Sequence, residues 1–517
     1  MRSSEQNQGF RGINPVTGEA LGSEFFDATL AEIDSAMADA GEAAETLRGL
    51  DGRRIEELLE AIASGLERRR EAIVGCCQLE TGYPSGRVAG EFQRMVAGMR
   101  RFGAVARRGD WLGVRIDHGD ALRQPVPKPD LRRMNVPIGP VVVFGASNFP
   151  LALSVAGSDV ASALAAGCPV VVKGHPSHPG TSQLLAESIS EAVSGASFPS
   201  GTFAMLQGAS TSVGQELVEH PEVRAVAFTG SLAGGRAIFD MAARREVPVP
   251  VYAEMGSSNP QFVFPELLEK DAAGFAKRLF AAATMGNGQF CTNPGLVFLP
   301  AGASTFFQHY QTQIAGDVGA PMLNARIRDA FEQGVDRWSR VPGLEILVGF
   351  RPAAGIAIGA MAVCARISLQ DFIAAGATLQ EEVFGPATLF IECAAADEFL
   401  HAARSFGGQL GASLHGTEGD LGGRLARELL ACLGGLAGRV LANAFPTGLE
   451  DCDALQHGGP YPATTDPHWT SVGTAAIERF GRPLAFQDVP DRLLPAALKA
   501  GNPLGIRRLV DGEFVEP

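Results

Sequence analysis

The stretch VVVFGASNFPLALSVAGSDVASALAAGCPVVVK (141–173) decides the fold of this chain. It begins and ends with short valine runs typical of buried strands, and the apolar segment between them is long enough for a crossover helix. Similar apolar runs follow, and the five predicted strands are 141–144, 169–173, 202–208, 225–231 and 249–256. Helical patterns separate them at 151–167, 181–193, 210–220 and 234–245. Five buried strands joined by four helices predict a parallel, doubly wound α/β sheet, which binds ligands at the carboxyl ends of its strands.

Outside this sheet the pattern changes. Residues 27–75 and 91–108 carry apolar side chains mostly at three- and four-residue spacing, which predicts helices, and prolines at 125–129 predict an excursion. A second α/β region is expected at about 260–453. The tail from Asp466 is too long for a frayed terminus, and we expect it to pack on a partner subunit.

Composition narrows the class of protein. A chain of 517 residues should divide into two or three domains, and a net charge of −14 argues against nucleic acid or an anionic membrane as a partner. The eight cysteines show no CxxC pair, and His175 and His178 lack a third ligand, so we expect neither a disulfide framework nor a metal site. The polar N-terminus and the absence of a long apolar span favour a cytoplasmic protein.

Three residues are candidates for chemistry. Cys291 follows Gly-Asn-Gly-Gln-Phe, whose glycines let the backbone bend closely around a thiol, although a lone cysteine is more often a small buried hydrophobe. Glu254 ends a predicted strand, so its carboxylate should emerge at the sheet edge, where a solvated or capping role is the usual alternative. Asn148 lies in Asn-Phe-Pro, which is also an ordinary turn.

The combination of motifs resembles the aldehyde dehydrogenase superfamily. The similar segments are SNFPLAL (147–153), VVK (171–173), AFTGS (227–231), AEMGSSNP (253–260), GQFC (288–291) and EEVFGP (381–386), and they stand in that family's order. The resemblance covers roughly residues 10–480. It implies a cofactor-binding domain (1–110 and 134–254), a catalytic domain (255–460) and small oligomerisation or bridging segments (111–133 and 461–517), within a homodimer or homotetramer.

The resemblance also implies a mechanism. A thiolate on Cys291 attacks an aldehyde, and the side chain of Asn148 and the backbone N–H of Cys291 stabilise the oxyanion. After hydride transfer to NAD(P)⁺, Glu254 activates the water that hydrolyses the thioester. The implied cofactor-binding residues are Phe144, Ser147, Lys173, His175, Ser177, Ser210, Thr229, Gly230, Ser231, Glu382 and Phe384.

Two departures from the family concern the cofactor. Relatives that prefer NAD⁺ commonly carry a glutamate three residues after the strand-end lysine, where it binds the ribose 2′-hydroxyl; Pro176 stands there in this chain. NADP⁺ is therefore admissible and favoured over NAD⁺. The family's frequent tryptophan before the oxyanion asparagine is Ser147, which should leave more room near the nicotinamide.

The C-terminal segments HGGPYPATT (457–465) and GNPLGI (501–506) resemble the branch of the family that acts on 2-oxoglutarate semialdehyde (2,5-dioxopentanoate) or on long-chain fatty aldehydes. Arg94 should face the substrate tunnel, where a guanidinium would pair with a carboxylate but would be unfavourable beside a fatty chain, unless it points to solvent. The semialdehyde is therefore the predicted substrate and the fatty aldehyde the alternative. The other predicted substrate-binding residues are Phe149, Phe290 and Thr292.

Two other functions stay open. A catalytically silent homologue with a structural role is disfavoured by the joint presence of Cys291, Glu254 and Asn148. A dehydrogenase that passes the thioester to coenzyme A is disfavoured by Glu254, because that base serves hydrolysis.

Overall fold

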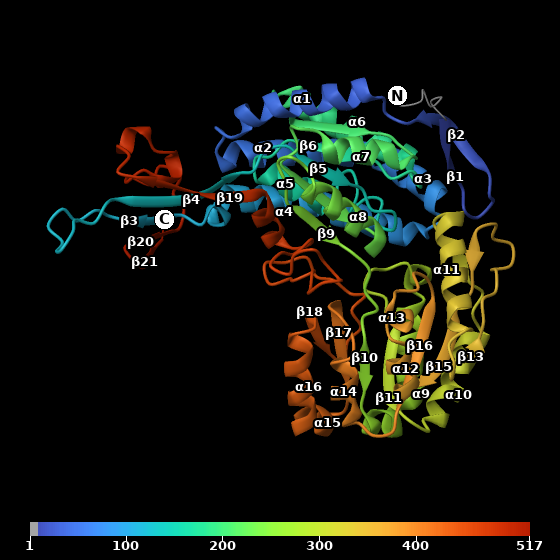
Figure 1. Cartoon of the computed structure of the whole chain (residues 1–517). Coiled ribbons are helices and arrows are strands. Elements are labelled where there is room, and N and C mark those ends of the chain that lie inside the picture. Colours follow the sequence, from blue (N-terminus) through green and yellow to red (C-terminus); the bar gives the residue numbers. More distant parts are fainter. Residues whose placement is uncertain (1–8, 517) are drawn as a thin grey trace.

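The computed structural model describes residues 9–516 and contains the predicted parallel sheet (Figure 1). Its five strands are parallel, in the order β7 (Phe203–Leu206), β6 (Val170–Lys173), β5 (Val141–Phe144), β8 (Ala225–Thr229) and β9 (Val251–Glu254). The chain enters at β5, runs outward to β7 and returns to β8. The strand order therefore reverses between β5 and β8, where a doubly wound sheet binds its ligand.

The crossover helices are α5 (Ser158–Ala165), α6 (Pro179–Gly195), α7 (Thr211–Glu219) and α8 (Leu232–Ala243). The prediction of a helix over 151–167 was wrong at its start, because residues 151–157 form turns. The backbone N–H groups of Leu151 and Ala152 donate to the buried carboxylate of Glu91, at 2.9 and 3.0 Å. A side chain sixty positions away thus satisfies two backbone donors of this turn segment.

The N-terminal region begins with a hairpin, β1 (Gly9–Ile13) and β2 (Ala20–Phe26), which the sequence did not predict. Helices α1 (Leu30–Leu47), α2 (Gly52–Arg68), α3 (Arg70–Thr81) and α4 (Ser85–Arg108) follow. Thr29 and Glu32 form a capping box at the start of α1, and Asp51 caps α2. The apolar faces of these helices share one core with the valines of β5 and β6, so they cover a face of the cofactor sheet.

The second α/β region is a seven-stranded sheet. Its order is β13 (Glu345–Val348), β15 (Val363–Ser368), β16 (Ala387–Cys393), β11 (Leu296–Pro300), β10 (Gln261–Val263), β17 (Gln409–His415) and β18 (Ala437–Ala442), with only β13 antiparallel. The helices beside it are α9 (Pro265–Ala283), α10 (Ser304–Ala315), α11 (Ala325–Trp338), α12 (Leu369–Ala375), α13 (Ala377–Gln380), α14 (Glu398–Ala403), α15 (Glu418–Gly422) and α16 (Arg424–Gly434). The short strands β12 (Ala320–Pro321) and β14 (Gly359–Ala360) pair separately.

A third sheet forms an arm that projects from the body (Figure 1). Its order is β19 (Gly481–Gln487), β4 (Leu131–Pro137), β3 (Arg115–Asp117), β20 (Arg508–Val510) and β21 (Glu513–Val515). The proline-rich excursion is the turn between β3 and β4, and the C-terminal tail supplies three strands. Contact of this arm with a partner subunit stays a prediction.

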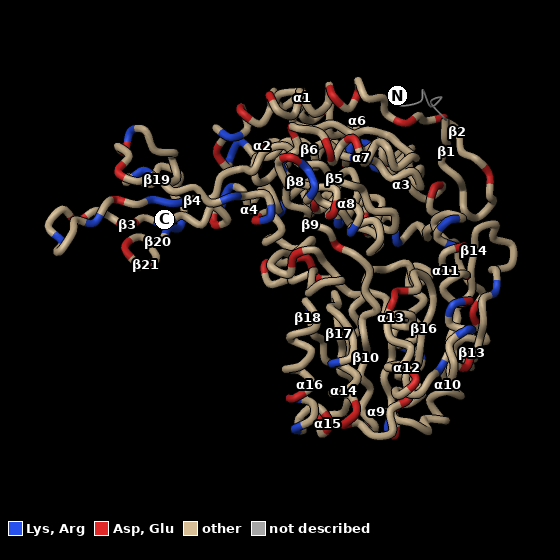
Figure 2. Tube along the Cα trace, viewed as in Figure 1, with Lys and Arg blue, Asp and Glu red and all other residues tan. Residues whose placement is uncertain are grey.

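Residues 461–480 do not join the arm but return to the body. The backbone N–H groups of Met255 and Thr465 donate to the carbonyl oxygens of Ala463 and Ala253, so this segment lies along β9. Acidic and basic residues are interspersed over the body and the arm (Figure 2). Among residues 9–516, no helix combines the length and apolar character needed to cross a membrane.

Candidate active site

The carboxyl ends of the cofactor strands open into a cavity of about 1030 Å³. All eleven residues predicted to bind the cofactor line it: Phe144, Ser147, Lys173, His175, Ser177, Ser210, Thr229, Gly230, Ser231, Glu382 and Phe384. The cavity also reaches Asn148, Glu254 and Cys291. The structure therefore brings the predicted cofactor and catalytic residues to one cleft between the five-stranded cofactor sheet and the seven-stranded sheet.

The turn before Cys291 has backbone φ angles that most residues cannot easily adopt. Gly286, Asn287 and Gly288 all have positive φ angles, 58°, 56° and 67°, which side chains other than asparagine and glycine rarely adopt. A Cβ atom on Gly288 would lie 2.1 Å from the carbonyl oxygen of Gly385, so no larger residue fits there. The glycines noted in the sequence thus bend the chain closely against the catalytic domain and set the position of the thiol.

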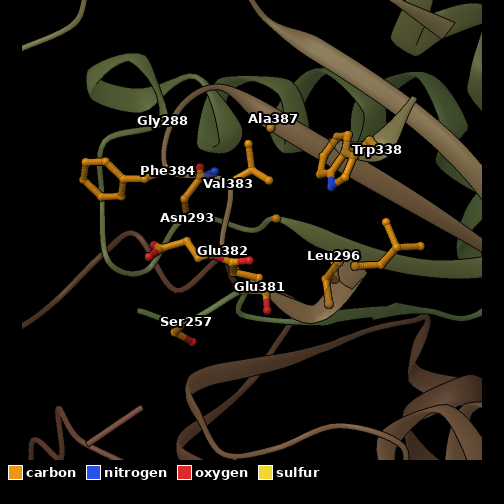
Figure 3. A pocket seen from close by; sticks show the side chains of 13 residues that line it. Ser257, Gly288, Asn293, Leu296, Trp338, Glu381, Glu382, Val383, Phe384 and Ala387 are labelled. Carbon is orange, nitrogen blue, oxygen red and sulfur yellow. The ribbon is translucent and has the colours of Figure 1, made fainter. Parts of the chain in front are cut away.

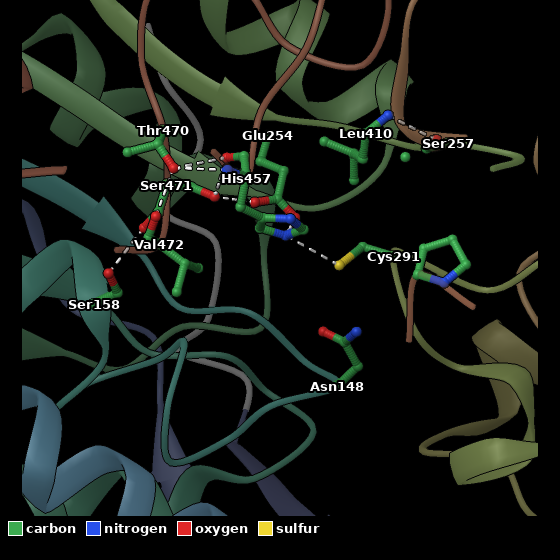
Figure 4. A network of polar contacts seen from close by, with 12 residues as sticks. Asn148, Ser158, Glu254, Ser257, Cys291, Leu410, His457, Thr470, Ser471 and Val472 are labelled. Atoms are coloured by element: carbon green, nitrogen blue, oxygen red, sulfur yellow. Dashed lines mark hydrogen bonds and ion pairs between the residues drawn. The ribbon is translucent and has the colours of Figure 1, made fainter. Parts of the chain in front are cut away.

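Cys291, His457 and Glu254 form a compact group (Figure 4). The Sγ of Cys291 lies 3.6 Å from Nε2 of His457, and the same nitrogen lies 3.2 Å from Oε1 of Glu254. The hydroxyl of Ser471 donates to the other carboxylate oxygen of Glu254. The side chains of His457 and Glu254 are only 1% and 2% exposed. One imidazole nitrogen can therefore exchange a proton with either the thiol or the carboxylate.

The charge of Glu254 disfavours ionisation of the neighbouring Cys291 thiol. Burial and the nearby Glu254 carboxylate raise the pKa of the Cys291 thiol well above its usual value. Burial also opposes ionisation of Glu254, but His457 and Ser471 outweigh it and lower the pKa of Glu254. The resting site therefore favours a protonated thiol beside an ionised carboxylate, and the thiol must lose its proton to a partner before it can attack.

Asn148 lines the same cavity as Cys291. Its Nδ2 donates to the carbonyl oxygen of Gln289 at 3.0 Å, two residues before the thiol. The backbone carbonyl oxygen of Asn148 accepts from the Tyr83 hydroxyl at 3.2 Å and from Nη2 of Arg87 at 3.0 Å. Within residues 9–516 the backbone N–H of Cys291 has no hydrogen-bond partner, so it is available as a second donor.

Glu382 and Phe384 extend to one side of their segment, whereas Val383 points to the other (Figure 3). Oε1 of Glu382 is buried without a hydrogen-bond partner in the described chain, and burial together with the charge of Glu254 raises its pKa to about 8. A buried carboxyl group in this state needs a polar partner. A ribose hydroxyl in the cavity would provide one.

At the opposite end, burial lowers the pKa of Lys173 to about 8, and its Nζ donates to the carbonyl oxygen of Gly208. Burial lowers the pKa of His175 well below its usual value. His178 stacks on His175 and is bonded to Ala146 and Ser182. His178 is thus a satisfied core histidine.

None of the four predicted substrate residues lines the cofactor cavity. The rings of Phe149 and Phe290 meet edge to face at 5.0 Å, and Thr292 is buried. Arg94 is half-buried on α4, with its guanidinium carbon 6.0 Å from the Phe149 ring centre, and its charge acts on the Cys291 thiol. In the part of the chain that the structure describes, Arg94 has no hydrogen bond or ion pair.

Sequence reasoning missed four residues of this site: His457, Ser471, Tyr83 and Arg87. His457 stands in the segment HGGPYPATT, which we used only as a branch signature. It lies 166 residues after Cys291 and 203 after Glu254, so no local spacing relates the three.

The comparisons with known proteins agree with this site. Residues 1–460 match the aldehyde dehydrogenase family, and the chain belongs to that family. It is 43% identical over 506 residues to "Alpha-ketoglutaric semialdehyde dehydrogenase 2" of Azospirillum brasilense, covering 97% of this chain and 96% of that protein. It is 41% identical to "Alpha-ketoglutaric semialdehyde dehydrogenase" of Acinetobacter baylyi, covering 98% and 95%.

Solved structures confirm the fold. The betaine aldehyde dehydrogenase of Staphylococcus aureus in complex with NAD⁺ superposes with a TM-score of 0.78 at 21% identity, covering 95% of this chain and 94% of that one. The predicted class, an NAD(P)-dependent aldehyde dehydrogenase with a mixed α/β fold, is thereby confirmed.

Proposed function

We propose that this chain oxidises 2-oxoglutarate semialdehyde to 2-oxoglutarate, with Arg94 as the anchor for the substrate carboxylate. The observation that carries the proposal is the position of the half-buried Arg94 guanidinium. It lies beside Phe149, makes no hydrogen bond or ion pair among residues 9–516, and acts electrostatically on the Cys291 nucleophile. A cation of this kind is unfavourable next to an alkyl chain but forms strong, charge-assisted hydrogen bonds with a carboxylate. The names of the two relatives above support the same substrate.

The first step is activation of the thiol. Nε2 of His457, in the tautomer that carries hydrogen on Nδ1, takes the proton of Cys291, and the resulting imidazolium donates that proton to the Glu254 carboxylate 3.2 Å away. The thiolate adds to the aldehyde carbon, which forms a C–S bond and places a negative charge on oxygen. The Asn148 amide and the Cys291 N–H stabilise that charge.

NAD(P)⁺, when bound, supplies the hydride acceptor. The residues present fit it, since a large cavity ends at the nucleophile, the α8 N-terminus borders it, and Glu382 offers an unsatisfied carboxyl oxygen. When the adduct of Cys291 and the aldehyde loses its hydride, a thioester remains on Cys291. Glu254 then takes a proton from the attacking water, the C–S bond breaks, and the acid is released.

For the cofactor we propose a preference for NADP⁺. Pro176 lines the cavity and offers no carboxylate to repel a 2′-phosphate, and Lys173 and Arg326 line the same cavity with positive side chains. We further propose that the enzyme is a cytoplasmic homodimer or homotetramer that associates through the arm.

The test is a set of initial rates with NADP⁺ and NAD⁺ on 2,5-dioxopentanoate, succinic semialdehyde and a medium-chain alkanal, with the acid product identified with and without coenzyme A. We expect the highest kcat/KM on 2,5-dioxopentanoate and no acyl-CoA. A higher kcat/KM on the alkanal would favour the fatty aldehyde alternative. Cys291→Ala should abolish turnover while cofactor affinity stays within a few-fold, and no activity of the native enzyme on any aldehyde would favour a silent homologue.

A further inference from the structure

The Cys291, His457 and Glu254 side chains also have the composition of a metal site. The described part of the chain holds one group of three or more His, Cys, Asp or Glu side chains suited to an ion, and it is this one. Its ligand atoms all lie within 4.8 Å of one another. Thiolate, imidazole and carboxylate are the three side-chain types that Zn²⁺ prefers in proteins.

The distances fit a tetrahedral ion. With Zn–S near 2.3 Å, Zn–N near 2.05 Å and Zn–O near 2.0 Å, a tetrahedron places sulfur about 3.6 Å from nitrogen and nitrogen about 3.3 Å from oxygen. The structure has Sγ and Nε2 3.6 Å apart and Nε2 and Oε1 3.2 Å apart. The two edges that involve Nε2 therefore match a tetrahedral ion, and the third edge, between sulfur and the carboxylate, is at most 4.8 Å.

The surroundings are also suitable. Ser471 donates to Oε2 of Glu254, which leaves Oε1 for a metal and holds the carboxylate as second-shell hydrogen bonds do in metal sites. The two anionic ligands would neutralise a divalent charge, and binding would release the thiol proton. Glu254 and Cys291 line the cavity, which provides an entry path.

We propose that Cys291, His457 and Glu254 form an inhibitory site for one Zn²⁺ ion, with a fourth position open to water. The bound ion ties up the nucleophile and the base together, so it blocks addition to the aldehyde reversibly. This inference goes beyond the proposed function and needs only the positions of the three side chains. It therefore stands or falls separately from the identity of the aldehyde.

Cobalt provides a direct probe, because Co²⁺ can replace Zn²⁺ in zinc sites and its thiolate complexes have charge-transfer absorption bands. Titration of the cofactor-free enzyme should show thiolate-to-cobalt charge-transfer absorption that saturates at one equivalent and disappears in Cys291→Ser. His457→Phe should weaken binding at least ten-fold, since loss even of a second-shell partner typically lowers metal affinity ~10- to 100-fold. Matched controls are His468→Phe, whose histidine is 81% exposed, and Cys452→Ser, whose cysteine is exposed; both should bind as the native chain does.

Activity gives the second readout. Zn²⁺ should inhibit competitively with the aldehyde, a chelator should restore the rate, and Zn²⁺ should protect Cys291 from alkylation. Protection is measurable even if His457→Phe turns over slowly, and it should then require at least ten-fold more Zn²⁺. Equal protection in native enzyme and His457→Phe, or a cobalt signal that survives Cys291→Ser, would overturn the proposal, whatever substrate the enzyme prefers.

Discussion

Replacing Arg94 by methionine tests the substrate proposal most directly. The substitution keeps much of the side-chain volume and removes the charge. Arg94 has no hydrogen bond or ion pair among residues 9–516, so its replacement breaks no hydrogen bond or ion pair within that part of the chain. The interactions removed are the contact with the Phe149 ring, whose centre lies 6.0 Å away, and the electrostatic effect of the guanidinium on Glu91 and Cys291. A large effect on one substrate alone must therefore come from that substrate.

The expected size follows from the environment of the guanidinium. A hydrogen bond to a charged group contributes about 1.5 to 3 kcal/mol, which corresponds to roughly a ten- to a hundred-fold change in kcat/KM. Burial raises the pKa of the nearby Glu91, so that acid offsets the charge of Arg94 less than an exposed carboxylate would. Arg94→Met should lose this factor on 2,5-dioxopentanoate and keep its activity on an uncharged alkanal of similar length.

One complication can be separated. The charge of Arg94 also lowers the pKa of Cys291, so its removal should raise that pKa and slow both substrates equally at a fixed pH. The ratio of kcat/KM between the two aldehydes cancels this effect. Arg100→Met is the matched control, because Arg100 lies on the same helix but pairs with Glu60 and Glu67 on the exposed surface. An unchanged ratio in Arg94→Met, or an equal change in Arg100→Met, would refute the assignment of Arg94 as the anchor.

Four further predictions concern the nucleophile, the base, the cofactor and the fold. His457→Phe should slow the pre-steady-state burst of reduced cofactor about 100-fold at pH 7, as expected for loss of a general base. The burst rate should recover at alkaline pH, where the thiol ionises without help. A normal burst at neutral pH would exclude His457 as the base that activates Cys291. Glu254→Gln should show the burst followed by slow hydrolysis, and it should alkylate at Cys291 faster than the native enzyme at pH 7, because the carboxylate that together with burial raises the thiol pKa is gone. In the native enzyme burial opposes ionisation of Glu254, but His457 and Ser471 outweigh it and hold its pKa below the usual value; hydrolysis should therefore keep its rate at acidic pH values where an ordinary glutamate is already becoming protonated. Pro176→Glu should lower kcat/KM for NADP⁺ at least ten-fold with little change for NAD⁺; equal losses would mean that residue 176 does not face the 2′-phosphate. Arg479→Met should lower the free energy of unfolding by about 3 to 5 kcal/mol, because Asp159, bonded to it at 2.7 Å, would be left buried without its partner, whereas Arg424→Met in an exposed pair should change it by less than about 1 kcal/mol in the same denaturant titration.

The sequence determined much of this protein because several of its signals are local. The short apolar runs 141–144 and 170–173 predicted buried strands, and the helix-length segment between them predicted a parallel crossover. Parallel strands end at a common edge, so residues just after them, such as Lys173 and Thr229, had to meet around one ligand. Similarly, the glycines at 286 and 288 indicated a tight turn before Cys291.

Tertiary structure alone decided the rest. The helix predicted at 151–167 begins only at Ser158, and the turns before it donate the backbone N–H groups of Leu151 and Ala152 to Glu91, an interaction that no periodicity around 151 reveals. The same holds for His457, which meets Cys291 and Glu254 only because residues 457–471 fold back along β9 from the far side of the catalytic domain. Periodicity reports which face of an element is buried, but the side chains that share a pocket are set by how distant segments pack, and that information is absent from any single stretch of sequence.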